Sequence, residues 1–223
     1  MSTQEYFKLN AEEIFEDVIK LEKEKFVSIE GIEFIVRPNV YPSDKFRTTS
    51  FVLKNIQPYL KDKTVCDMGC GLGVVGQYAL EHGAKRVVQA DINPYAIENA
   101  EANRELHKGL NKETSIYQSD CFDNVPKQIF DIIVWNMPFH TEPMVIKNPL
   151  EHAFHDPYFQ SLKKFLNQLP DYSHENTLTF IAFSNKGDIE GIEKIFDSSN
   201  LNWELWKVIN ADQAYDNRIY LIK

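Results

Sequence analysis

The sequence has little of what marks secreted and membrane proteins. It has 3 cysteines in 223 residues, too few and too irregularly spaced for a disulfide framework or a four-ligand zinc site. No apolar run approaches the roughly 20 residues that a membrane-spanning helix needs. The first 20 residues alternate acidic and apolar side chains and lack the basic segment and apolar run of a signal peptide. We therefore expect a soluble, cytoplasmic protein without a membrane partner.

Positive charge is also scarce. The chain has 24 Lys+Arg against 33 Asp+Glu, a formal net charge of −9. Affinity for duplex nucleic acid comes mainly from clustered Lys and Arg, so we do not expect duplex DNA as a partner. Nearly half of the acidic excess lies in residues 1–30. The charge therefore leaves RNA, protein and small-molecule substrates open.

The first part of the chain reads as an extension of the domain that follows. Residues 1–25 have the spacing of an acidic amphipathic helix, and 26–36 alternate around Glu30-Gly31 as a β-hairpin does. Residues 43–57 favour a helix that ends before Pro58. No linker divides the chain, so we expect residues 1–60 to pack as a cap on a domain of residues 61–223.

From Lys63 onward, short apolar strands alternate with longer helical stretches. This alternation predicts an α/β fold with a Rossmann-like, doubly wound and mostly parallel sheet of seven strands. The last two strands have no helix between them, so the last strand should be antiparallel. The expected strands are 64–68, 85–90, 114–118, 129–135, 176–184, 202–208 and 217–222, and the expected helices are 73–82, 94–107, 150–169 and 188–199.

A glycine-rich loop follows the first parallel strand and fits two motifs. Gly71-x-Gly73-x-x-Gly76 matches the dinucleotide fingerprint, which a nicotinamide-dependent oxidoreductase would use. The overlapping Asp67-x-Gly69-x-Gly71-x-Gly73 places a carboxylate at the strand tip, where it would repel a pyrophosphate. That carboxylate suits a ligand with an ammonium and a sulfonium group, which favours S-adenosylmethionine.

Two further acids follow the next two strands. Asp91, with its neighbour Ile92, is placed to accept both ribose hydroxyls of the cofactor, or else to cap the helix that begins at Asn93-Pro94. Asp120, with Cys121 beside it, is placed to accept from an adenine amino group while Phe122 packs on the ring. The alternative for Asp120 is an ordinary turn aspartate.

The fourth parallel strand runs into Asn136-Met137-Pro138-Phe139-His140. A planar NH2 group is a poor nucleophile because its lone pair is delocalised. If the Asn136 oxygen and a nearby backbone carbonyl each accept one N–H, that lone pair can point at a methyl group, and Phe139 can stack on the substrate. We therefore predict Asn136, Pro138 and Phe139 as catalytic residues, with Asn136 also beside the cofactor. A simple strand-ending turn is the alternative.

Histidines gather near this tip and raise the question of a metal. His152-Ala153-Phe154-His155-Asp156 lacks a Glu or Cys partner at ligand spacing, so we expect no metal. We expect Met137, His140 and His155 to line the substrate mouth instead. The residues of the 152–156 stretch are placed either to line this mouth or to cap the helix that starts at Asp156-Pro157.

Together these motifs stand in the order of the class I S-adenosylmethionine-dependent methyltransferases, which the chain resembles over about residues 40–222. It looks most like the small-domain branch with an Asn-Pro-Pro-aromatic motif, whose members methylate guanine N2 in ribosomal RNA or a glutamine amide in proteins. Met137 departs from that motif, where the first proline is usual. The resemblance also implies cofactor contacts from the segment ahead of the glycine loop, at Tyr41, Asp44, Thr48 and Thr49.

The sequence thus predicts an S-adenosylmethionine-dependent N-methyltransferase that acts on a planar nitrogen, either a nucleobase amine in RNA or an amide in a protein. A small-molecule or non-nitrogen acceptor is an alternative. A nicotinamide-dependent oxidoreductase and a non-catalytic S-adenosylmethionine-binding partner subunit are alternatives of other classes.

Overall fold

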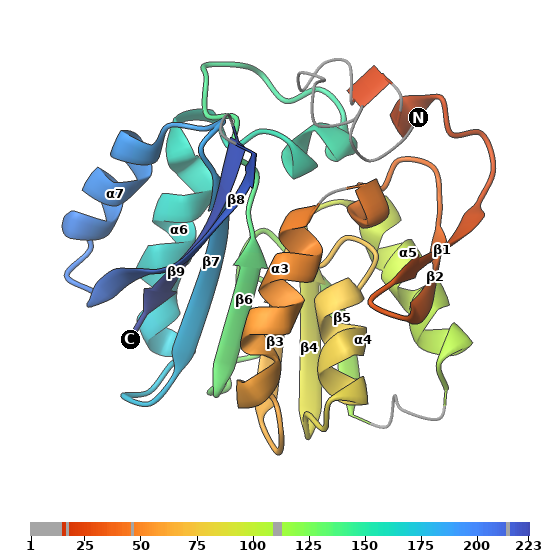
Figure 1. Ribbon diagram of the computed structural model, residues 1–223, viewed down its shortest axis with the longest axis horizontal. Coiled ribbons are helices and arrows are strands. Elements are labelled where there is room, and N and C mark those ends of the chain that lie inside the picture. Colours follow the sequence, from red (N-terminus) through yellow and green to blue (C-terminus); the bar gives the residue numbers. More distant parts are fainter. Residues whose placement is uncertain (1–14, 17, 46, 109–112, 213–214) are drawn as a thin grey trace.

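The computed structural model describes residues 15–16, 18–45, 47–108, 113–212 and 215–223 (Figure 1). Its centre is a seven-stranded sheet in the order β5-β4-β3-β6-β7-β9-β8. The strands are β3 (Thr64–Met68), β4 (Arg86–Asp91), β5 (Thr114–Gln118), β6 (Ile132–Asn136), β7 (Leu178–Ser184), β8 (Trp203–Asp212) and β9 (Tyr215–Ile222).

The strand directions confirm the predicted topology. Strands β5, β4, β3, β6 and β7 pair in parallel, whereas β9 is antiparallel to both β7 and β8. The chain winds outward from β3 through β4 and β5, and then returns to the other side of β3 at β6. In open α/β sheets, ligands bind at the carboxyl ends of the strands beside such a reversal. The fold therefore favours a site above β3 and β6.

Helices cover both faces of the sheet, as Figure 1 shows. One face packs against α3 (Arg47–Ile56) and α4 (Val74–Glu81), and this core includes Val65, Val134 and Phe180. The other face packs against α6 (Gln160–Gln168) and α7 (Ile189–Asp197). Helix α5 (Pro94–Leu106) begins at Asn93, whose side chain accepts from the Tyr95 N–H, with Pro94 in the first helical position.

The predicted hairpin is present as β1 (Lys25–Ile29) and β2 (Ile32–Val36). It is tied to α5, because the Asn103 Oδ1 accepts from the Ile35 N–H at 2.7 Å and the Asn99 Oδ1 from the Arg37 N–H at 2.8 Å. Asn103 also donates to the carbonyl of Leu72 at 2.9 Å, which links the hairpin to the glycine loop. The division of the chain at residue 60 stays a prediction.

The helix predicted over 1–25 falls mostly outside the described residues. In the described part its helical residues end at Ile19, and β1 begins at Lys25, so the helix does not reach its expected end. The next helix begins later than expected, because a 3-10 turn, η1 (Ser43–Lys45), precedes α3, which is followed by a second turn, η2 (Gln57–Tyr59).

The helix predicted over 150–169 is wrong as one continuous element. It is divided into η3 (Pro149–Ala153), η4 (Pro157–Phe159), α6 and a last turn η5 (Leu169–Asp171). The break has a local cause, since Tyr158 and Phe159 take left-handed φ angles of 58° and 55°. The Asp156 carboxylate then accepts from the N–H groups of Ser161 and Leu162 at 2.8 and 3.0 Å, which caps α6.

Strand β6 is shorter than the predicted 129–135. The backbone leaves the ladder before Ile132, because the Phe130 N–H donates to the carbonyl of Tyr172 rather than to a neighbouring strand. The strand still ends at Asn136, so the Asn136–Phe139 segment lies at the carboxyl edge of the sheet, as predicted.

Candidate active site

A cavity lies at the carboxyl ends of the central strands and brings most of the predicted residues together. The sequence-predicted residues that line it are Tyr41, Thr48, Thr49, Asp67, Gly69, Gly71, Asp91, Ile92, Asp120, Cys121, Asn136, Met137, Pro138 and Phe139. Five predicted residues do not line it, namely Asp44, Gly73, Phe122, His140 and His155.

The glycine loop offers an open cradle at Gly71. This residue has a left-handed φ of 53°, and a Cβ built on it would meet no atom within 4 Å. Its N–H donates to the Asp91 Oδ2 at 2.9 Å, while the other carboxylate oxygen of Asp91 accepts from the Asn93 N–H at 2.9 Å. Asp91 thus holds the loop against the start of α5, and the space at Gly71 is left for a ligand.

Gly73, which was predicted to contact the cofactor, serves packing instead. A Cβ on Gly73 would lie 2.9 Å from the Gln89 Nε2, and one on Gly76 only 2.0 Å from the same atom. The Gln89 amide also donates to the carbonyl of Gly73 at 3.1 Å. These two glycines let α4 approach β4 closely, which the motif alone does not distinguish from ligand binding.

Asp67 is a buried acid at the tip of β3. It is 3% exposed, and its Oδ2 accepts from the Gly76 N–H at 3.0 Å. Burial raises the pKa of Asp67 to about 7; the hydrogen bond from Gly76 opposes this, and the charge of Asp91 adds to it. A cationic ligand in the cavity would lower the pKa of Asp67 and favour its ionised form. This is the electrostatic fit that the sequence predicts.

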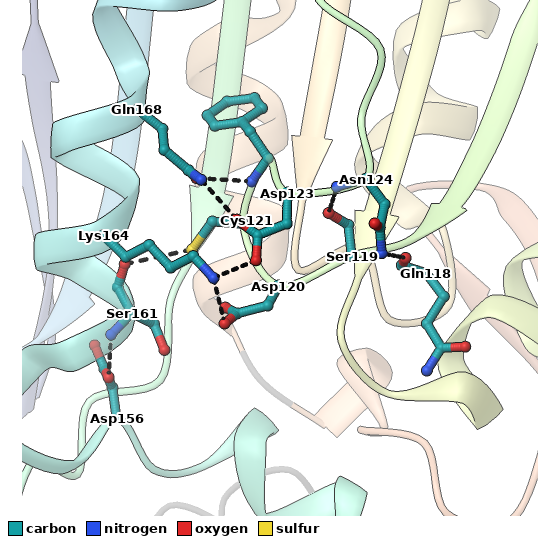
Figure 2. Close-up of polar contacts among 11 residues, drawn as sticks. Gln118, Ser119, Asp120, Cys121, Asp123, Asn124, Asp156, Ser161, Lys164 and Gln168 are labelled. Atoms are coloured by element: carbon teal, nitrogen blue, oxygen red, sulfur yellow. Dashed lines mark hydrogen bonds and ion pairs between the residues drawn. The ribbon is translucent and has the colours of Figure 1, made fainter.

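Asp120 lies on the cavity rim and is already paired. Figure 2 shows the Lys164 ammonium between two carboxylates, with the Nζ 2.6 Å from the Asp120 Oδ2 and 2.5 Å from the Asp123 Oδ2. Gln168 donates to the other oxygen of Asp123 at 2.8 Å. The pair fixes the Asp120 carboxylate just beyond the end of β5, on the lining of the cavity.

Phe122 does not pack on a ligand ring, contrary to the prediction. It is 1% exposed, is absent from the cavity lining, and stacks on Tyr172 with ring centroids 4.1 Å apart. The left-handed backbone of Cys121 (φ 51°) turns the chain between Asp120 and Phe122, so one side chain faces the rim and the other the core.

The Asn136–Phe139 segment forms the other side of the cavity. Among the described residues, the Asn136 side chain has no hydrogen-bond partner, so its amide is available to a ligand. Met137 is buried, and its N–H donates to the carbonyl of Ala182 at 3.3 Å. The buried methionine anchors the loop where the related motif has a proline.

The predicted substrate-mouth histidines, His140 and His155, do not line the cavity. His140 and His155 form a β-bridge, and their ring centroids are 5.4 Å apart. Burial lowers the pKa of His140 and the charge of His155 adds to this. The two residues hold the 139–156 loop together rather than line the cavity. Asp44 is also outside the cavity, where its Oδ2 pairs with the Lys25 Nζ at 3.4 Å.

His152, from the stretch expected to line the substrate mouth or cap a helix, lines the cavity, whereas sequence reasoning missed several other polar or aromatic residues of the lining, among them Phe183, Ser184 and Asn217. Ser184 and Asn217 face each other across β7 and β9. For Asn217 the sequence offers one signal, a polar residue in a row that is otherwise apolar. Asn217 precedes Ile219 and Leu221, which lie on the same side of β9.

Comparison with known proteins decides the family. The sequence profile described as "Methyltransferase small domain" matches residues 31–164. The chain belongs to this family. A protein of Methanocaldococcus jannaschii named "Putative protein N5-glutamine methyltransferase" is 33% identical over 174 residues, which are 76% of this chain and 85% of the relative.

Other relatives of this methyltransferase share only the central part. The ribosomal protein L11 methyltransferase of Aquifex aeolicus is 34% identical over 57% of this chain and 55% of its own length. The ribosomal RNA small subunit methyltransferase C of Shigella flexneri serotype 5b is 32% identical over 51% of this chain and 32% of its own length. This methyltransferase thus spans one third to about half of these two longer relatives.

Solved structures show the same fold. The T. thermophilus 16S rRNA N2 G1207 methyltransferase, in complex with AdoMet and guanosine, has a TM-score of 0.65 at 19% identity, over 90% of this chain and 50% of its own. The ribosomal protein L11 methylase of Lactobacillus delbrueckii subsp. bulgaricus has a TM-score of 0.61 at 18% identity, over 84% of both chains.

The family and these neighbours confirm that the protein is an enzyme, a class I methyltransferase with S-adenosylmethionine as its cofactor. The cavity fits that molecule, because the open cradle at Gly71 and the buried acid Asp67 stand side by side on its wall. Within the described ranges, no helix is both long and apolar enough to cross a membrane.

Proposed function

We propose that this methyltransferase transfers a methyl group to the side-chain amide nitrogen of a protein glutamine. The observation that carries the proposal is the unengaged Asn136 amide at the carboxyl end of β6, followed at once by Pro138 and Phe139. The relative that this chain matches over 85% of its length carries a protein N5-glutamine methyltransferase name. None of the described side chains that line the cavity belongs to Lys or Arg, which suits a neutral amide better than a phosphate backbone.

The cofactor half of the cavity is formed by Asp67, Gly69, Gly71, Asp91 and Asp120, at the ends of β3, β4 and β5. In this half, Asp91 would accept from the ribose hydroxyls, Asp120 from the adenine amine, and Asp67 would face the cationic end. Ile92, Cys121, Tyr41, Thr48 and Thr49 would complete the contacts. When bound, S-adenosylmethionine supplies a methyl carbon activated by a positively charged sulfur.

The acceptor half is formed by Asn136, Pro138, Phe139, Ser184 and Asn217, at the ends of β6, β7 and β9. The Asn136 Oδ1 and the backbone carbonyl of Met137 or Pro138 would each accept one N–H of the substrate amide. Both acceptors then hold the two protons out of the path of attack, so the nitrogen lone pair points toward the cofactor half. Phe139 would pack on the flat face of the amide and fix this approach.

A guanine amine in RNA is the second candidate. It is favoured by Phe139, whose ring suits stacking on a base, and by the rRNA methyltransferase relative. It is opposed by the absence of cationic side chains from the described lining of the cavity.

Incubation of the protein with tritium-labelled cofactor and a whole-cell extract tests the proposal. We expect label that protease releases and RNase does not, recovered as N5-methylglutamine after enzymatic digestion to amino acids. Label that RNase releases, or protein label on lysine or another amino acid, contradicts the proposal and leaves the family assignment intact.

A further inference from the structure

One buried amide in the acceptor half has an unused donor. Asn217 lines the cavity and is 0% exposed, and its Oδ1 accepts from the Thr48 Oγ1 at 2.8 Å. Its Nδ2 is buried and finds no hydrogen-bond partner among the described residues. A buried donor without an acceptor costs free energy, so such groups are rare unless a ligand or water completes them.

The orientation of this amide is set by α3. Thr48, in the first turn of α3, occupies the Oδ1 of Asn217 with its hydroxyl, across 169 residues of sequence. Because that oxygen is already bonded, the amide presents its NH2 edge to any further partner. The structure therefore offers a positioned N–H donor, and the natural ligand for it is an oxygen or nitrogen with a free lone pair.

The strands place Asn217 on the same face of the sheet as Asn136. Ile132 and Val134 of β6, and Ile219 and Leu221 of β9, all belong to the core cluster on the α3 side. Side chains alternate along a strand, so Asn136 and Asn217 continue these two rows at the edge of the sheet. Ser184, which pairs with Asn217, continues the row of Phe180 and Ala182 between them.

Sheet order puts Asn217 nearer to the acceptor than to the cofactor. Strand β9 lies two strands from β6 and three from β3. At a strand spacing of about 4.8 Å these separations are about 10 Å and about 14 Å. A planar group held by Asn136 thus has room on its far side for a second contact, and Asn217 lies on that side.

We propose that Asn217 binds the methyl acceptor by donating its Nδ2 N–H to the carbonyl oxygen of the amide whose nitrogen Asn136 holds. The assignment rests on the proposed function and adds to it a residue that makes the site specific for a primary amide. A primary amide carries a donor nitrogen and an acceptor oxygen on one carbon, so Asn136 and Asn217 together recognise both ends. A carboxylate would instead place an oxygen against the Asn136 Oδ1, and the site rejects it.

Binding of a blocked glutamine, N-acetyl-glutamine N-methylamide, tests the assignment on protein saturated with S-adenosylhomocysteine. The variants are Asn217→Asp, which turns the donor into an acceptor, and Asn217→Leu, which removes it at similar size. Affinity of both variants for the probe should fall by about tenfold or more, since an unmatched buried polar group discriminates strongly. Thr48→Val, which releases the Asn217 oxygen, should lose about threefold.

S-adenosylhomocysteine itself is the internal control, because its affinity reports both folding and the cofactor half. We expect its Kd to change by less than about twofold in both Asn217 variants, with thermal unfolding that stays cooperative. Unchanged probe affinity in both Asn217 variants overturns the assignment. An equal loss of S-adenosylhomocysteine affinity also overturns it, because the Asn217 N–H would then bind the carboxylate of the cofactor. If the wild-type protein binds blocked glutamate as well as blocked glutamine, the proposed function itself fails.

Discussion

The two halves of the cavity differ in how far the protein already engages their carboxylates and side-chain amides in hydrogen bonds and ion pairs. In the cofactor half, the Asp67 and Asp91 carboxylates accept backbone N–H groups, and Asp120 is paired with Lys164. In the acceptor half, the Asn136 amide and the Asn217 Nδ2 have no partner among the described residues.

This difference separates two tasks. A cofactor of fixed shape can bind to a rigid surface. The Asp67 and Asp91 carboxylates supply one, because each also accepts a backbone hydrogen bond that holds the glycine loop or the helix after it in place. A reacting group needs hydrogen bonds that form only when it arrives, and these remain open on the β6–β9 side. Variants that disturb one half and spare the other can test the separation.

Asn136→Ala should have the largest effect, and only on chemistry. Without the Oδ1 acceptor the substrate nitrogen is no longer oriented, so turnover with the labelled cofactor should fall by about a thousandfold. A single-turnover measurement separates this loss from product release. Turnover within about threefold of the wild type would remove Asn136 from the mechanism.

Gly71→Ala should weaken the cofactor half. The new methyl group fills the open space at the loop and strains a φ of 53°, so affinity for S-adenosylhomocysteine should fall by about thirtyfold. Gly31→Ala is the matched control, because Gly31 has a φ of 82°, equally open space, and a place in the β1–β2 turn. Both variants should lose similar thermal stability, and equal losses of affinity would contradict a role for the loop in binding.

Asp120→Ala and Asp123→Ala form a second matched pair. Each removes one of the two partners of Lys164, but only Asp120 lines the cavity. Calorimetry should show about a fivefold loss of S-adenosylhomocysteine affinity for the Asp120 variant and less than twofold for the Asp123 variant. If the two losses are the same, Asp120 acts through its ion pair and does not contact the adenine.

Asp67→Asn should raise thermal stability while it weakens cofactor binding. The native pKa of about 7 lies above the ordinary Asp value of 3.8, so the folded state holds a proton that the unfolded state releases between these two pH values. Wild-type stability therefore falls as the pH rises through this window. We expect the variant to melt about 5 °C higher at pH 8.

The gain in melting temperature should shrink as the pH falls toward 4, where the wild-type carboxyl is protonated in the folded state and close to half protonated in the unfolded state. An advantage that is the same at pH 8 and near pH 4 would show that burial of the Asp67 charge is not its cause.

The sheet could be predicted because its signals are local. The strands predicted over 64–68 and 114–118 have the bounds of β3 and β5. The helix over 150–169 was wrong, although its apolar spacing is helical. Tyr158 and Phe159 take left-handed conformations that residue propensities do not indicate, and these break the helix. The Asp156 carboxylate then caps the new helix start at α6.

The place of a residue in the cavity could be predicted where a motif identifies it, since Asp67, Asp91 and Asn136 all line the cavity. It could not be predicted where the partner is distant in sequence. Asn217 depends on Thr48 of α3, and Phe122 is removed from the cavity by its stack on Tyr172. Gly73 shows a third limit, because the same glycine pattern serves ligand binding and helix packing.

Calorimetric titration of S-adenosylhomocysteine into Asp91→Ala and Asn136→Ala, beside the wild type, tests the separation of the two halves most directly. Asp91 holds the glycine loop and is the residue that we propose to accept from the ribose hydroxyls, so its variant should lose affinity by at least about tenfold. The sequence also predicts Asn136 beside the cofactor, but in the proposed function its amide binds the acceptor, so its variant should bind within about twofold of the wild type. Equal losses in the two variants, or retained affinity in Asp91→Ala, would contradict the account.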